Sequence, residues 1–121
     1  FGGAVGAVSR YWLMNIVKSM SAGSAHAGFP WGTLTVNIIG SLLIGVLFIV
    51  LSEKMAVPEA WRGLLIVGYL GAFTTFSTFS LDALLLLQQG NAAQALAYIL
   101  SSVLICTGAA WAGVTITRAL I

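Results

Sequence analysis

From Trp31 to Ser52 the chain carries no charged side chain, and the same is true from Gly63 to Leu81. Each run is long enough to cross a bilayer, because a transmembrane helix takes about 20 predominantly apolar residues. Charged residues make up 7% of the 121 residues, whereas soluble domains carry about 25%. The chain has too few charges to cover a surface that faces water, so the sequence predicts an integral membrane protein.

Two further apolar segments, one at each end of the chain, complete the pattern. Turn residues separate the segments, and each segment is expected to form one helix. The opening residues, Phe1–Gly3, include neither an initiator Met nor a basic leader, and we expect a trimmed first helix there rather than a signal peptide. The sequence therefore predicts one all-α transmembrane domain over residues 1–121. Its four helices are expected at about 1–20, 31–52, 62–87 and 92–118.

The inventory of reactive side chains argues against an enzyme. The chain has one Cys, one His and three acidic residues, too few for a disulfide framework or a metal site with several Cys or His ligands. The net charge of +2 comes from isolated cations rather than a basic patch, so nucleic acid is not an expected partner. We expect His26 to be a solvated loop residue and Cys106 a small buried hydrophobic one.

A block of hydroxyl side chains interrupts the third segment. Five of the seven residues in 74–80 are Ser or Thr, and Gly68 and Gly71 stand just before them. One interpretation is that the hydroxyls bond back to carbonyls of the preceding turn while the glycines allow close helix packing. The other is a helix broken near mid-membrane, whose freed backbone groups line a site. The number of hydroxyls favours the break.

Asn37 is a polar residue deep in the second segment. Thr33, Gly40 and Ser41 lie one turn away from it and share its helix face. Its amide either makes a hydrogen bond between helices, which is common in membrane proteins, or faces a permeating anion. Taken alone, Asn37 favours the first interpretation.

The remaining polar residues of the apolar segments are ambiguous in the same way. Tyr98, Ser102 and Cys106 recur at four-residue spacing and form a stripe that, alone, favours packing. Arg10 either extends to the interface or places a positive charge in a watery vestibule, where it attracts anions. Asp82 is a natural partner for a cation, although spacing does not show that the two meet.

The distribution of Lys and Arg gives only a weak orientation signal. Lys54, Arg62 and Arg118 are expected on the side of the termini, against Lys18 on the other. Cytoplasmic loops carry the excess of cations, so the count favours a cytoplasmic N-terminus. So small a bias is compatible with a chain that inserts in both orientations.

Four stretches spread over nearly the whole chain resemble the Fluc/CrcB family of small fluoride channels. They are Gly-Gly-Ala-Val-Gly-Ala-Val-Ser-Arg-Tyr at 2–11, Gly-Thr-Leu-Thr-Val-Asn at 32–37, Gly-Ala-Phe-Thr-Thr-Phe-Ser-Thr-Phe-Ser at 71–80, and Gln-Gly-Asn at 89–91. The third stretch is the specific one. Two departures stand out: Asp82 where relatives often have Glu, and Cys106 where a hydroxyl is frequent.

The resemblance implies a fold and a set of site residues. It implies subunits that pair as an antiparallel, dual-topology homodimer with two fluoride pores and a structural Na⁺ at the dimer interface. The Na⁺ would be held by the backbone carbonyls of Gly71 and Thr74. The residues that the resemblance assigns to the pore are Asn37, the paired Phe76 and Phe79, Ser77, the polar track of Thr33, Tyr98 and Ser102, and the vestibule arginine Arg10.

The predicted function is a passive, fluoride-selective channel in the cell inner membrane that exports fluoride from a microbial cytoplasm. One alternative is a small dual-topology multidrug exporter, which needs a mid-membrane carboxylate in its first helix. Here that helix has Arg10 and no acid. The other alternative is a non-transporting membrane assembly subunit.

Overall fold

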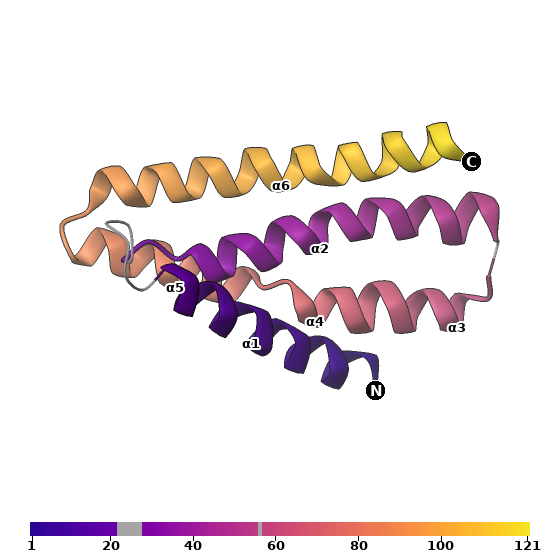
Figure 1. The fold of residues 1–121 in the computed structure, drawn as a ribbon, viewed down its shortest axis with the longest axis horizontal. Coiled ribbons are helices and arrows are strands. Elements are labelled where there is room, and N and C mark those ends of the chain that lie inside the picture. Colours follow the sequence, from indigo (N-terminus) through magenta and orange to yellow (C-terminus); the bar gives the residue numbers. More distant parts are fainter. Residues whose placement is uncertain (22–27, 56) are drawn as a thin grey trace.

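The computed structural model describes residues 1–21, 28–55 and 57–121, and these form helices without any strand. The described helices run back and forth along the long axis of the molecule, with α1 inclined to the others (Figure 1). The passes consist of α1 (Gly2–Ser21), α2 (Trp31–Ile49) continued by η1 (Val50–Lys54), the series α3 (Glu59–Arg62), η2 (Gly63–Leu70), α4 (Gly71–Phe73) and α5 (Phe76–Gln88), and α6 (Ala92–Leu120). His26, expected in a solvated loop, lies outside the described residues.

Within the residues that the structure describes, three helical segments are long and apolar enough to cross a membrane. They are Trp31–Lys54, Glu59–Gln88 and Ala92–Leu120. They correspond to the helices expected at 31–52, 62–87 and 92–118. The first helix, α1, is not among them, and it carries two cations, Arg10 and Lys18.

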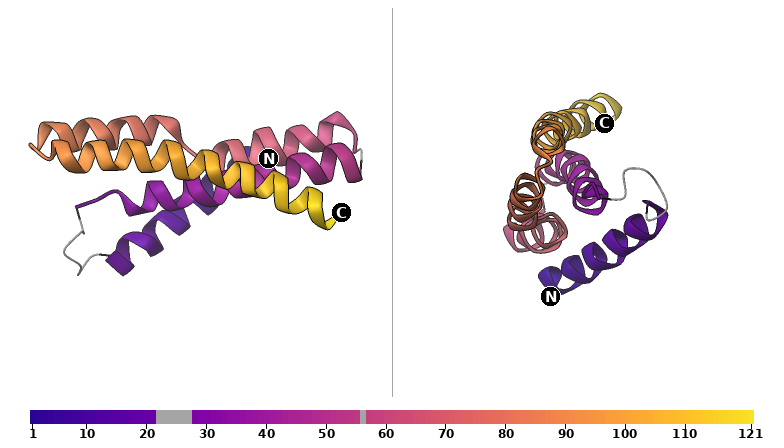
Figure 2. Two further views of the ribbon diagram at one scale, coloured as in Figure 1. Left: turned by 90° about the horizontal axis from the view of Figure 1, so that it is seen from above. Right: turned by 90° about the vertical axis from the view of Figure 1, so that its left-hand side faces the viewer.

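Helix α2 packs along α6 and faces the third pass, α5 packs directly on α6, and α1 crosses at an angle (Figures 1 and 2). Glycines bring α2 and α6 into backbone contact. A Cβ atom added at Gly45 would lie 2.3 Å from the carbonyl oxygen of Ala110, and one at Gly113 would lie 2.4 Å from that of Leu42. Small residues of this kind let membrane helices approach closely, so α2 and α6 are tightly packed against each other.

Two stretches of π-helix flank the connection between the second and third passes, and the sequence did not predict them. They are η1 and the eight-residue η2, whose backbone bonds join residues five apart. Helix α1 packs on η2 through Gly6, where a Cβ atom would lie 2.2 Å from the Tyr69 carbonyl oxygen. The Tyr69 hydroxyl donates to Ser9 Oγ at 3.1 Å, which fixes α1 against the first half of the third pass.

The third pass is broken between α4 and α5. Thr74 (φ −87°, ψ 163°) and Thr75 (φ −153°, ψ 123°) are extended, so α4 ends at Phe73 and α5 begins at Phe76. The interruption falls inside the hydroxyl block, where the sequence predicts it.

Candidate ion site at the helix break

The two extended threonines terminate one helix and begin the next. The Thr74 backbone N–H and the Thr74 hydroxyl both donate to the Leu70 carbonyl oxygen, each at 3.0 Å. The Thr75 hydroxyl accepts a hydrogen bond from the Thr78 backbone N–H at 3.2 Å. It is therefore the N-cap of α5, a position that favours hydroxyl side chains.

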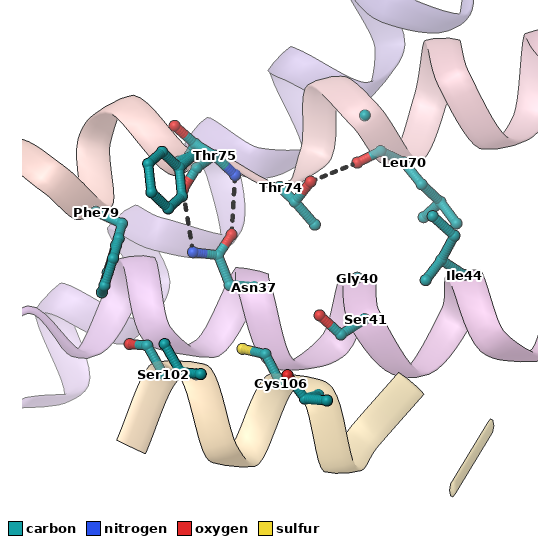
Figure 3. Close-up of a pocket in the computed structure, with 14 residues that line it drawn as sticks. Asn37, Gly40, Ser41, Ile44, Leu70, Thr74, Thr75, Phe79, Ser102 and Cys106 are labelled. Carbon is teal, nitrogen blue, oxygen red and sulfur yellow. Dashed lines mark hydrogen bonds between the residues drawn. The ribbon is translucent and has the colours of Figure 1, made fainter. Parts of the chain in front are cut away.

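Asn37 holds the break from the neighbouring helix. Its side-chain Nδ2 donates to the Thr75 carbonyl oxygen at 3.1 Å, and its Oδ1 accepts from the Thr75 backbone N–H at 2.8 Å (Figure 3). One carboxamide thus pairs with both backbone groups of a residue that has left the helix. This pairing is important for stability because an unpaired backbone group in lipid costs several kcal/mol. Asn37 therefore makes the predicted hydrogen bond between helices, and the group that it bonds to is the backbone of Thr75 at the break.

This pairing leaves carbonyl groups of the break without their usual donors. In a continuous helix the Thr75 N–H would donate to the Gly71 carbonyl, but here it donates to Asn37. Both interpretations of the hydroxyl block are realised in part, because the helix is broken and Ser80 still bonds back to the Phe76 carbonyl at 3.0 Å.

A cavity of about 360 Å³ lies between the break, α2 and α6. Figure 3 shows Asn37 on one of its walls and Ser102 and Cys106 on another. Ser102 Oγ is buried and makes no hydrogen bond to any residue that the structure describes. The cavity therefore has an unpaired hydroxyl and a carboxamide on its walls. Its polar lining residues are Asn37, Ser41, Thr74, Thr75, Ser102, Cys106 and Thr107.

Two phenylalanines of α5 line the same cavity. The Phe76 and Phe79 rings are tilted, with centroids 5.5 Å apart. Phe79 in turn contacts Tyr98, at 5.1 Å between centroids. Phe76 is 78% exposed within the single subunit, so its ring projects away from the helices of its own chain.

A second cavity, of about 410 Å³, lies near the end of the molecule where α1 meets α2. Asp82 lines it, and Asp82 Oδ2 accepts hydrogen bonds from the hydroxyls of Thr33 at 2.7 Å and Tyr98 at 3.3 Å. Asp82 forms no ion pair in the part of the chain that is described, where Arg118 and Glu53 form the salt bridge. The partners of Asp82 are thus hydroxyls and not the cation that the sequence suggested.

The structure brings some of the predicted site residues together and leaves others apart. Asn37, Phe76, Phe79 and Ser102 share the first cavity with Gly71 and Thr74, whereas Thr33 lines the second. Tyr98 is fully buried between them. Ser77 is exposed and Arg10 is half-buried, and neither lines a described cavity. Thr75, which pairs with Asn37 and lines the first cavity, was not among the predicted site residues, although it lies in the hydroxyl block.

Comparison with known proteins assigns the chain to a family. Residues 1–114 match the family model described as CrcB-like protein, Camphor Resistance (CrcB). The chain belongs to the CrcB family. It is 51% identical to a protein of Magnetococcus marinus over 97% of this chain and 92% of that protein. It is 50% identical to one of Hahella chejuensis (97% and 89%) and 47% identical to one of Rhizobium meliloti (99% and 93%). Each of these relatives is named fluoride-specific ion channel FluC.

Membership of this family agrees with the helical segments described above. Three helices fit a bilayer by length and composition, and the family's curated relatives carry the name of a channel rather than of an enzyme. The protein is therefore a multi-pass membrane protein of a channel family.

Proposed function

We propose that this protein is a fluoride channel that lets fluoride leave the cytoplasm passively across the cell inner membrane. The observation that carries the proposal is the first cavity, where a carboxamide, an unpaired buried hydroxyl and two phenylalanines meet at a break in a membrane helix. The names of the relatives support fluoride as the ion. Export has a physical basis, because HF crosses membranes as a neutral molecule and dissociates inside at near-neutral pH.

The walls of the cavity suit a small, strongly hydrated anion. A selective pore must replace the water around the ion without binding it too tightly. The Asn37 amide has two N–H donors, of which one is used on Thr75 and one remains for an ion. Ser102 adds a hydroxyl without a partner, and the positive edge of a phenylalanine ring can face an anion. These groups attract fluoride without a fixed charge.

A second copy of the chain would complete the pore. Phe76 is 78% exposed in one subunit, and the helices of a single subunit are too few to enclose the cavity. We propose an antiparallel homodimer of dual topology, in which α1 is the fourth crossing and both subunits line each pore. The weak asymmetry of Lys and Arg supports insertion in both orientations.

The break also offers oxygen ligands for a structural Na⁺ at the dimer interface. The Gly71 carbonyl loses its helical donor, and Thr74 leaves the helix with its carbonyl, so the oxygens suit a hard cation. Within residues 1–21, 28–55 and 57–121, no cluster of His, Cys, Asp or Glu could hold a metal. The Gly71 and Thr74 carbonyls of both subunits would hold the Na⁺, whose charge favours anions nearby.

The first alternative, a multidrug exporter, has less support. Proton exchange needs an acid in the membrane, and α1 contains Arg10 and Lys18 but no carboxylate. The acid that does lie inside the helices, Asp82, is bonded to two hydroxyls. A purely structural subunit would leave the unpaired Ser102 hydroxyl unexplained.

The test is fluoride efflux from liposomes that contain the purified protein, with a potassium ionophore to balance charge and a fluoride electrode to record release. We expect rapid release of fluoride while chloride is retained, with empty liposomes and the variant Phe79→Ile as controls. Phe79→Ile should slow release because it removes the ring edge while keeping an apolar side chain. No release from a folded, reconstituted dimer, or equal release of chloride, would contradict the proposal.

A further inference from the structure

We propose that the Asp82 carboxylate competes internally with the permeating anion: it occupies the hydroxyls of Thr33 and Tyr98, and fluoride binds this hydroxyl pair by displacing it. Asp82 would then set the apparent affinity of the channel for fluoride. The inference rests on the proposed function of the chain as a fluoride channel and adds a residue and a binding step to it.

The hydroxyl pair converges on a single atom. Thr33 from α2 and Tyr98 from α6 both donate to Asp82 Oδ2, at 2.7 and 3.3 Å. Thr33 is 2% exposed and Tyr98 is fully buried, so water reaches neither hydroxyl freely. Buried donors need an acceptor, and the structure supplies one oxygen for both.

A fluoride ion and a carboxylate oxygen bind the same kind of hydrogen-bond donor. Both are small anionic acceptors that form short, strong hydrogen bonds with O–H donors. Two donors that point at one atom match a monoatomic anion as well as they match Oδ2. Two negative charges at one place repel each other, so the ion and the carboxylate exclude each other from the pair.

The hydroxyl pair lies between the two cavities. The Tyr98 ring packs on Phe79, with centroids 5.1 Å apart, and Phe79 lines the cavity at the break. Thr33 and Asp82 line the second cavity. The hydroxyl pair and Asp82 therefore contact residues of both cavities, and in the proposed channel an anion that moves between the cavities would meet these hydroxyls.

The second cavity has room and charge to receive a displaced carboxylate. Asp82 is only half-buried, and the cavity of about 410 Å³ beside it is also lined by Lys18 and Asn15 from α1. Lys18 takes part in no salt bridge in the part of the chain that the structure describes. Its ammonium group and the Asn15 amide can accept the carboxylate once an anion takes its place.

The first test is the dependence of flux on fluoride concentration in liposomes that contain Asp82→Asn. The amide has the same shape but no charge, and it is a weaker acceptor. We expect the half-saturating fluoride concentration to fall roughly fivefold, since a hydrogen bond to a charged group is stronger than one to a neutral group. Glu59→Gln is the matched control, because it removes one negative charge at an exposed site of α3.

The results separate competition from the other roles of Asp82. A half-saturating concentration that stays unchanged would make Asp82 a structural acceptor, and one that rises would make it part of the fluoride site; either overturns the proposal. In a Tyr98→Phe background, which removes one of the two donors, the effect of Asp82→Asn should shrink. An undiminished effect there would also contradict competition at this pair.

A second measurement does not depend on transport or on the folding of Asp82→Asn. In Glu53→Gln/Glu59→Gln, Asp82 is the one side-chain carboxylate left, since the chain has three acidic residues. Infrared difference spectra with and without fluoride should show its carboxylate band shift as it leaves the hydroxyls, with chloride as the control. A band that fluoride does not move overturns the proposal. Absent fluoride flux in the wild type would instead count against the proposed function.

Discussion

Two polar centres of this chain lie among its described helices, and they are built on opposite principles. At the break, the Asn37 side chain pairs with the backbone of Thr75 through two hydrogen bonds. Around Asp82, by contrast, one carboxylate oxygen accepts hydrogen bonds from two side-chain hydroxyls. The first centre ties a side chain to the main chain, and the second consists of side chains alone.

This difference indicates which centre can change during conduction. Backbone groups in a membrane have no other partner, so releasing Thr75 from Asn37 would leave an N–H and a carbonyl unsatisfied. A carboxylate on rotatable bonds, with a cavity beside it, can leave its hydroxyls if another anion replaces it. In the proposed channel, the break would be the fixed part of the pathway and Asp82 the part that moves.

The largest effect is expected from Asn37→Ala, which breaks the fixed centre. It leaves both backbone groups of Thr75 without a partner, and we expect the free energy of unfolding in detergent to fall by about 3 kcal/mol. Fluoride flux should fall with it. Asn91→Ala is the matched control, because the Asn91 side chain makes no capping hydrogen bond. Unchanged stability of Asn37→Ala would show that Asn37 serves the ion alone.

A smaller effect is expected from Gly40→Ala, which tests how tightly the break is packed. A Cβ atom there would lie 2.1 Å from the Thr74 Cγ2 methyl, and overpacking of this kind costs about 2 kcal/mol. Thr74→Ser removes that methyl and keeps the hydroxyl, so Gly40→Ala/Thr74→Ser should recover stability in denaturant titrations. Gly63→Ala, with open space around it, is the control. Failure of the double variant to recover would place the clash elsewhere.

The smallest effect on stability is expected from Ser102→Ala, which removes a hydroxyl that belongs to neither of the two hydrogen-bonded centres. Both centres owe their stability to hydrogen-bonded partners, whereas Ser102 Oγ has no such partner among the residues that the structure describes. Its removal should change the unfolding free energy by less than about 0.5 kcal/mol and still reduce fluoride flux. Ser101→Ala, whose hydroxyl bonds to the Ala97 carbonyl, is the control for flux. A flux equal to wild type would remove Ser102 from the pathway.

The sequence predicted the features that lipid imposes. Uncharged runs about as long as the hydrocarbon core is thick located the apolar helices. The hydroxyls beside Gly71 located the break, because polar groups in lipid need a structural reason. The sequence could not predict that Asn37 meets Thr75, 38 positions away, since that contact depends on how α2 and the third pass align.

Two other features escaped prediction for physical reasons. The π-helices η1 and η2 have backbone bonds one residue longer than α-helical ones, and a segment that is apolar on every side carries no periodicity that reveals the change. Asp82 was interpreted as a natural partner for a cation, although spacing did not show that the two meet. Its partners in the structure are hydroxyls from α2 and α6, and such contacts between distant segments cannot be read from the sequence.

Thr75 commits its N–H, its carbonyl and its hydroxyl to three separate hydrogen bonds. Any local opening at this residue therefore frees α2 from the break and uncaps α5 in the same event. The middle of α2 and the start of α5 should then exchange their amide hydrogens together, as one cooperative unit. An interruption in a membrane helix need not be a point of looseness, and here it joins two elements into a single block that opens as a whole or not at all.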